Sequence, residues 1–151
     1  MFIQTIGWPC SEKRIHCECV CANESLSGMP LSHLKKVLHL EDEVIIAMDV
    51  DDTLRSANVA EVVHFTRCAD AMRALETLGF DAAILDVAVS DGSTAKVAAR
   101  LKELHIPFLI YTGSPEFLEQ DHGGAPCLIK PVSAEVLINE MQAALALATI
   151  S

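Results

Sequence analysis

The sequence predicts an α/β fold in which a five-stranded parallel sheet is doubly wound, with helices on both faces. Three observations predict it. Short apolar runs of strand length each end at a charged or hydroxyl residue. These runs alternate with longer segments of helical periodicity, which is the element order of a parallel sheet with crossover helices. Finally, 51% of the 151 residues are hydrophobic, as expected where a parallel sheet is covered on both sides.

The expected elements begin after residue 31 and alternate regularly. In chain order they are a strand (35–40), a helix (43–57), a strand (59–65), a helix (68–78), a strand (82–86), a helix (94–104), a strand (107–111), a short helix (115–120), a strand (126–129) and a helix (133–148). The strands are placed on the apolar runs, which charges and turn residues delimit.

Apolar spacing and capping residues support the helices. In the first helix Val50 and Leu54 fall on one stripe, which we expect to face the sheet. In the second, Leu75 and Leu78 have the same helical spacing. The last helix begins after Ser133, a residue type that caps helix N-termini. No internal repeat or low-complexity linker interrupts the pattern, so residues 32–150 are predicted to form one domain.

Residues 1–31 differ from the rest of the chain and are predicted to be a tail. They hold four of the six cysteines and lack a sustained apolar period. Cys17, Cys19 and Cys21 could offer soft ligands to a metal, but their spacing lacks the Cys-x-x-Cys pairs of common structural zinc sites, so we expect no metal role. Met29 is a candidate for the natural start.

Charge and hydropathy exclude two classes of partner. The net charge of −10 argues against nucleic acid, whose phosphates are bound by clustered Lys and Arg. No apolar run approaches the ~18 residues of a membrane span. The tail has no long apolar core before a small-residue cleavage site, so we expect no secretory signal, a cytoplasmic location and reduced thiols.

Polar side chains follow four of the predicted strands. Glu41 and Asp42 follow the first, Asp86 the third, Thr112 the fourth and Lys130 the fifth. Because the carboxyl ends of parallel strands meet at one edge of a sheet, where ligands bind in open α/β folds, we expect these groups to gather there. Carboxylates suit a divalent metal and an ammonium suits phosphoryl oxygens. The sequence therefore predicts a site for both.

These motifs resemble those of the receiver domain of two-component response regulators. The match covers about residues 35–148 and runs through Val37–Glu43, Ile84–Asp86, Tyr111–Gly113 and Ile129–Pro131. It implies a flavodoxin-like (CheY-like) fold and a role in phosphorelay signal transduction. Asp86 is then the phosphoacceptor, which would make the chain a phosphoprotein carrying an aspartyl phosphate.

The resemblance also assigns the other site residues. It makes Thr112 the switch hydroxyl and Lys130 the ion-pairing lysine, and it gives Mg²⁺ to Glu41, Asp42 and Asp86. The backbone carbonyl of Ala88 would complete the metal ligands, and the peptide before Pro131 is expected to be cis.

The resemblance further implies partners and a mode of action. The phosphodonor would be a histidine kinase or a phosphotransfer protein, and an unknown downstream protein would receive the signal. We expect a stand-alone receiver that signals by protein contact, with no enzymatic activity beyond its own phosphorylation and dephosphorylation.

Two departures from the receiver pattern affect the switch and the surface. Many receivers have an aromatic switch residue three positions before the lysine, where this chain has Cys127. The short interval from Thr112 to Lys130 leaves room for only a stunted fourth helix, which alters the surface that commonly dimerises. The altered surface is still compatible with a homodimer.

The sequence patterns allow three other interpretations. A pseudo-receiver would use the fold for docking without phosphorylation. Taken singly, the acidic residues after the first strand could be only a favourable first helical turn. Finally, Val44–Leu54 resembles the strand and Asp-x-Asp-x-Thr motif that open haloacid dehalogenase-type phosphohydrolases, with Asp49 as nucleophile and Asp51 as general acid/base. That alternative leaves Glu41, Asp42 and Asp86 unexplained.

Overall fold

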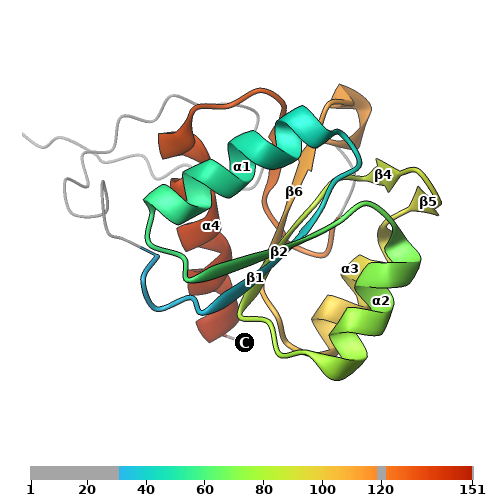
Figure 1. Ribbon diagram of the computed structural model, residues 1–151, viewed down its shortest axis with the longest axis horizontal. Coiled ribbons are helices and arrows are strands. Elements are labelled where there is room, and N and C mark those ends of the chain that lie inside the picture. Colours follow the sequence, from blue (N-terminus) through green and yellow to red (C-terminus); the bar gives the residue numbers. More distant parts are fainter. Residues whose placement is uncertain (1–30, 119–121, 151) are drawn as a thin grey trace, which may run out of the picture.

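A computed structural model describes residues 31–118 and 122–150 and contains a five-stranded parallel sheet (Figure 1). The strand order is β2-β1-β3-β6-β7, the order of one common doubly wound fold. The predicted fold class is therefore confirmed. The strands of this sheet are β1 (Lys36–Leu40), β2 (Glu61–Phe65), β3 (Ala82–Leu85), β6 (Phe108–Thr112) and β7 (Cys127–Ile129).

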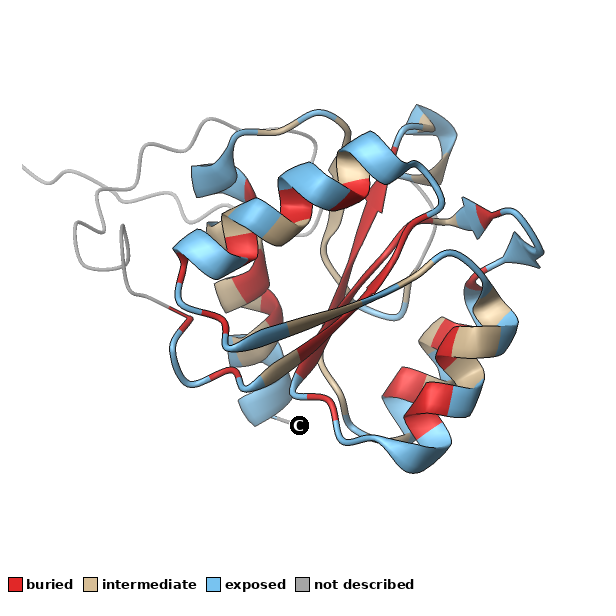
Figure 2. Cartoon of the chain, in the orientation of Figure 1, coloured by how far each residue is buried: buried red, intermediate tan, exposed pale blue. Residues whose placement is uncertain are grey.

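Four α-helices cover the two faces of the sheet in the described part of the chain (Figure 1). On one face α1 (Val44–Ser56) and α4 (Ala134–Thr149) enclose a core that includes Val50, Leu54 and Met141. On the other face α2 (Cys68–Thr77) and α3 (Ala95–Glu103) enclose a second core. The three central strands are buried along almost their whole length, whereas β2 and β7 at the edges are partly exposed (Figure 2).

The element boundaries agree with the expected ones to within two residues, apart from the short helix. Between β6 and β7 the described residues form one turn of 3-10 helix, η1 (Pro115–Phe117), where a helix over 115–120 was expected. The last two of those expected residues lie outside the described part. The sequence also gave no indication of an antiparallel hairpin after β3, formed by β4 (Ala88–Val89) and β5 (Gly92–Ser93).

The N-terminus of α4 and the buried face of α2 can be compared with what the sequence predicts. Ser133 caps α4, and its side chain accepts a hydrogen bond from the Val136 N–H at 3.3 Å. The buried stripe of α2 consists of Ala71, Ala74 and Leu75. Leu78, which has the same helical spacing in the sequence, follows the helix end and is 42% exposed, so it does not extend that stripe.

Almost all of the predicted tail lies outside the described residues. Residues 1–30, which contain Cys17, Cys19, Cys21 and Met29, lie outside the described residues. Within residues 31–118 and 122–150, no helix has the length and apolar character to cross a bilayer.

Candidate functional site

Strand pairing brings the predicted site residues to one edge of the sheet. The Asp86 N–H donates to the Leu40 carbonyl at 2.9 Å, which places Asp86 beside the end of β1, where Glu41 begins the next loop. The Lys130 N–H donates to the Thr112 carbonyl at 2.8 Å, which fixes the end of β7 against the end of β6. The parallel register therefore sets the backbone positions of the site.

The ammonium of Lys130 lies between two carboxylates. Its Nζ is 2.5 Å from Glu41 Oε2 and 2.6 Å from Asp86 Oδ2. The Lys130 side chain is 6% exposed and that of Glu41 is 1% exposed, so the charges are largely withdrawn from water. Glu43, at 3.9 Å from the same ammonium, is a more distant and exposed third carboxylate.

These contacts shift the pKa of both partners. Burial alone would lower the pKa of Lys130, but its hydrogen bonds to Asp86 and Glu41 more than offset this, so the pKa is raised and Lys130 stays charged. Burial also raises the pKa of the Glu41 carboxyl, and the hydrogen bond from Lys130 offsets that shift only in part. The group is thus an ion pair with one excess carboxylate.

Glu41, Asp42 and Asp86 form a group of oxygen ligands suited to a hard cation. One carboxylate oxygen from each lies within 4.8 Å of the others. Mg²⁺ prefers oxygen ligands and usually keeps several waters, so a few carboxylates at an accessible edge fit it. Ala88 is the first residue of β4, two positions after Asp86. Its part in metal binding stays a prediction.

Thr112 is the last residue of β6 and its side chain is buried. Its Oγ1 accepts a hydrogen bond from the Ser114 N–H at 3.2 Å, which leaves the hydroxyl hydrogen as a donor. The peptide between Lys130 and Pro131 is cis, as expected. Cys127, the first residue of β7, is half-buried and packs against the α2/α3 core.

Three residues near the site were not predicted from the sequence. Tyr111 lies under Lys130, with the ammonium 5.7 Å from the ring centroid. His39 is buried beside His64, their ring centroids 5.5 Å apart. Burial, and then the charges of His64 and Lys130, lowers the pKa of His39 to about 3, so it is neutral. In the sequence these three residues lie inside predicted strands, so the pattern indicated only that they pack in the sheet.

The phosphohydrolase alternative requires a strand where the structure has α1. Asp49 and Asp51 both lie inside this helix, not at a strand end. Asp51 is instead paired with Arg55 one turn later, at 2.9 Å, and the Thr53 hydroxyl donates to the Asp49 carbonyl. The interpretation of these residues as a hydrolase motif was therefore wrong.

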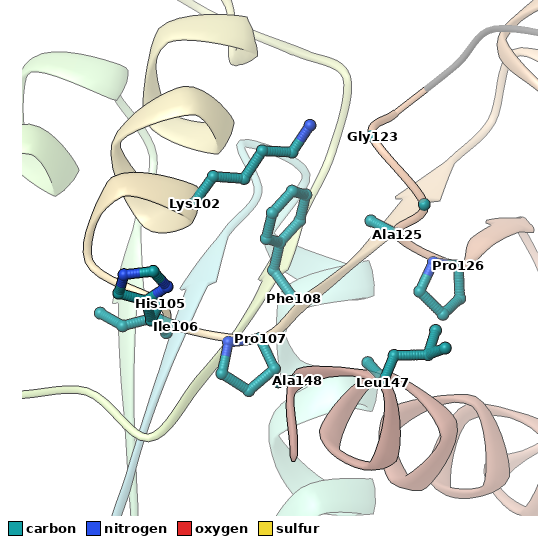
Figure 3. A pocket seen from close by; sticks show the side chains of 12 residues that line it. Lys102, His105, Ile106, Pro107, Phe108, Gly123, Ala125, Pro126, Leu147 and Ala148 are labelled. Atoms are coloured by element: carbon teal, nitrogen blue, oxygen red, sulfur yellow. The ribbon is translucent and has the colours of Figure 1, made fainter. Parts of the chain in front are cut away.

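A separate cavity of about 280 Å³ lies at the opposite end of the sheet (Figure 3). The last turn of α3, the start of β6 and the end of α4 line it, and Lys102 reaches across it toward Gly123 (Figure 3). Because it opens at the amino ends of β6 and β7, this cavity does not belong to the acidic site.

Comparisons with known proteins agree with this geometry. No family model matches the chain, and no curated protein matches it. Among solved structures it is similar to SdrG from Sphingomonas melonis Fr1, with 33% identity, a TM-score of 0.63, and coverage of 77% of this chain and 99% of that one. It is also similar to a response regulator receiver protein from Sinorhizobium medicae WSM419, with 21% identity, a TM-score of 0.67, and coverage of 76% and 96%.

A third similar structure has a ligand in its name. It is the response regulator TrrA from Thermotoga maritima in complex with Mg(2+)-BeF, with 18% identity, a TM-score of 0.66, and coverage of 74% of this chain and 99% of that one. The fold and the strand-end site define a CheY-like α/β signalling domain. The chain belongs to the response regulator receiver family.

Proposed function

We propose that this protein accepts a phosphoryl group on Asp86 in phosphorelay signal transduction and then signals by protein contact. The observation that carries the proposal is the ammonium of Lys130, held at 2.5 and 2.6 Å from the carboxylates of Glu41 and Asp86. A buried lysine between two carboxylates at the ligand-binding edge of a parallel sheet suits the handling of an anionic group. Well-packed apolar residues often stabilise a protein core as well as a buried ion pair does. Stability alone therefore does not explain these buried charges.

The chemistry proposed for Asp86 is an in-line transfer. A carboxylate oxygen of Asp86 forms a bond to phosphorus, while the bond from phosphorus to the donor breaks and its electron pair leaves with the donor. Bound Mg²⁺ would neutralise charge between the nucleophile and the phosphoryl oxygens. Lys130 donates N–H groups to those oxygens, and the free hydroxyl hydrogen of Thr112 is available to do the same.

We infer that Glu41, Asp42 and Asp86 hold this Mg²⁺, together with the carbonyl of Ala88. The support is chemical, because the three carboxylates supply only hard oxygen ligands. The protein itself would catalyse no reaction on metabolites, and its only turnover would be its own phosphorylation and dephosphorylation.

The phosphodonor is proposed to be a cytoplasmic histidine kinase or phosphotransfer protein. Val44, Ile45 and Met48 form an exposed apolar surface on the first turns of α1, and Ile45 is 83% exposed. This surface begins two residues after Asp42, so a protein that docks on it brings its phosphoryl group to the acidic site. Such exposed apolar residues beside a reactive group indicate a protein partner.

The test is to incubate the purified protein with Mg²⁺ and acetyl phosphate, trap any acyl phosphate with borohydride and map it by mass spectrometry. We expect modification at Asp86, its loss in Asp86→Asn, and its retention in Asp49→Asn, a matched control on the exposed side of α1. Absence of modification from acetyl phosphate and from the host's kinases would contradict the proposal. If Asp86→Asn also behaved like wild type in the cell, the docking module would be favoured.

A further inference from the structure

Tyr111 is a buried aromatic residue directly before Thr112 on β6. The residue is 4% exposed and belongs to the core between the sheet and the α1/α4 layer. A buried tyrosine usually finds a hydrogen-bond partner for its hydroxyl, so the choice of that partner is informative. Here the partner lies in the segment that follows Lys130.

The Tyr111 side chain contacts this segment at two points. Its hydroxyl accepts a hydrogen bond from the Val132 N–H at 3.3 Å. The face of its ring lies 5.7 Å from the Lys130 ammonium, inside the ~6 Å at which a cation is attracted to an aromatic face. The Lys130 N–H also donates a hydrogen bond to the Thr112 carbonyl. Two hydrogen bonds to β6 residues therefore hold the segment 130–132, one at each end.

These contacts matter because a lysine is not positioned by its own stem. The side chain has four flexible carbons and an ammonium whose donors rotate freely. Two carboxylates hold the ammonium at 2.5 and 2.6 Å, but they do not fix the backbone from which the lysine stem starts. The ring of Tyr111 adds an uncharged contact to the ammonium, and the hydrogen bond from the Val132 N–H to the Tyr111 hydroxyl fixes the backbone from which the stem starts.

We propose that Tyr111 is a positioning residue for Lys130 and thereby sets how fast Asp86 takes a phosphoryl group. This inference rests on the proposed function. In the reaction with acetyl phosphate, an oxygen of Asp86 bonds to phosphorus and acetate leaves with the electron pair of the broken bond. The ammonium stabilises the phosphoryl oxygens during this exchange only where it is already in place, since such stabilisation depends on preorganised donors.

The test is a double-mutant cycle between Tyr111→Phe and Lys130→Met. Tyr111→Phe removes only the hydroxyl that accepts from Val132, and we expect phosphorylation of Asp86 by acetyl phosphate to slow about fivefold. In the Lys130→Met background the same change should slow the reaction no further, because Tyr111 acts through the ammonium. An equal slowing in both backgrounds, or none in the first, would overturn the proposal.

Phe108→Leu is the matched control. Phe108 is a buried aromatic on the same strand, but it packs in the α2/α3 core on the other face of the sheet. All rates are measured where urea denaturation shows each variant to be folded. Phe108→Leu should take up the phosphoryl group at the wild-type rate. If it slows as much as Tyr111→Phe, the effect of Tyr111 is one of core packing and the proposal fails.

A second readout keeps this inference separate from the proposed function. If wild type takes no phosphoryl group, the proposed function fails, and the ε-methylene NMR resonances of Lys130 still report where the ammonium lies. Because Tyr111→Phe keeps the aromatic ring, a change in these resonances in that variant reports a displaced lysine, not a missing ring. We expect the change in Tyr111→Phe and not in Phe108→Leu, and unchanged resonances in Tyr111→Phe would overturn the inference.

Discussion

Replacing Lys130 by methionine removes the positive charge that holds two buried carboxylates together. Surface ion pairs are worth about 0–1 kcal/mol, but breaking a buried pair by removing one partner costs about 3–5 kcal/mol. The side chains of Lys130, Glu41 and Asp86 are 6%, 1% and 11% exposed, so the larger range applies. Two carboxylate oxygens within 4.8 Å also repel by about 3 kcal/mol at an effective dielectric constant of ~20.

Protonation of one carboxylate limits this loss, because burial already raises the pKa of Glu41. We therefore expect Lys130→Met to lower the free energy of unfolding by about 3 kcal/mol in the presence of a chelator. The measurement is urea denaturation followed by circular dichroism. Millimolar Mg²⁺ should recover at least about 1 kcal/mol more in the variant than in wild type, because a bound cation replaces the missing ammonium and stabilises only the folded state.

Lys36→Met is the control for this experiment. Lys36 pairs with Glu61 at 3.2 Å on the exposed edge of the sheet, so its replacement should cost less than about 1 kcal/mol with or without Mg²⁺. The reasoning is refuted if the Lys130→Met loss is no larger than that of the control. It is equally refuted if Mg²⁺ stabilises Lys130→Met no more than wild type.

Two further predictions concern His39 and the α1 surface. The unfolded chain protonates His39 below its ordinary pKa of 6.5, whereas the folded protein does so only near 3, so stability is lost as the pH falls. Between about pH 7.5 and about pH 5 this loss amounts to about 2 kcal/mol in urea denaturation. His39→Leu should remove this pH-dependent loss of stability, whereas the exposed control His33→Gln should keep it. If the free energy of unfolding of His39→Leu falls with pH as steeply as that of wild type, the loss does not come from His39. Ile45→Ser should slow phosphoryl transfer from a histidine kinase by roughly tenfold while uptake from acetyl phosphate is unchanged; equal slowing with both donors would argue against docking on α1.

The part of the site that follows from strand ends could be predicted from the sequence. Asp86 and Lys130 each come directly after a short apolar run, and the parallel arrangement alone brings such ends to one edge. The fold class followed in the same way, from the alternation of strand and helix patterns. These features depend on local pattern and on one topological rule, so no long-range detail was needed.

Other features depend on register and packing, which local pattern does not contain. The hairpin of β4 and β5 has two residues in each strand, too few for an alternating pattern. The contact of Tyr111 with Val132 depends on the pairing of Tyr111 with Leu128 and on the path of the chain after Pro131. Leu78 has the spacing of a buried residue but lies beyond the end of α2. Each of these features follows only from the three-dimensional arrangement of the chain.

Asp86 and Lys130 follow strands that differ in burial and in strand pairing. Asp86 follows β3, which is buried throughout and paired on both sides. Lys130 follows β7, a half-buried strand that pairs with β6 alone among the described residues. Segments with little buried apolar surface open at lower free energy than the centre of a sheet. Local opening of this edge therefore withdraws the cation while the carboxylates stay in place, so the lysine, and not the aspartate, is the group whose absence the domain can sample without unfolding.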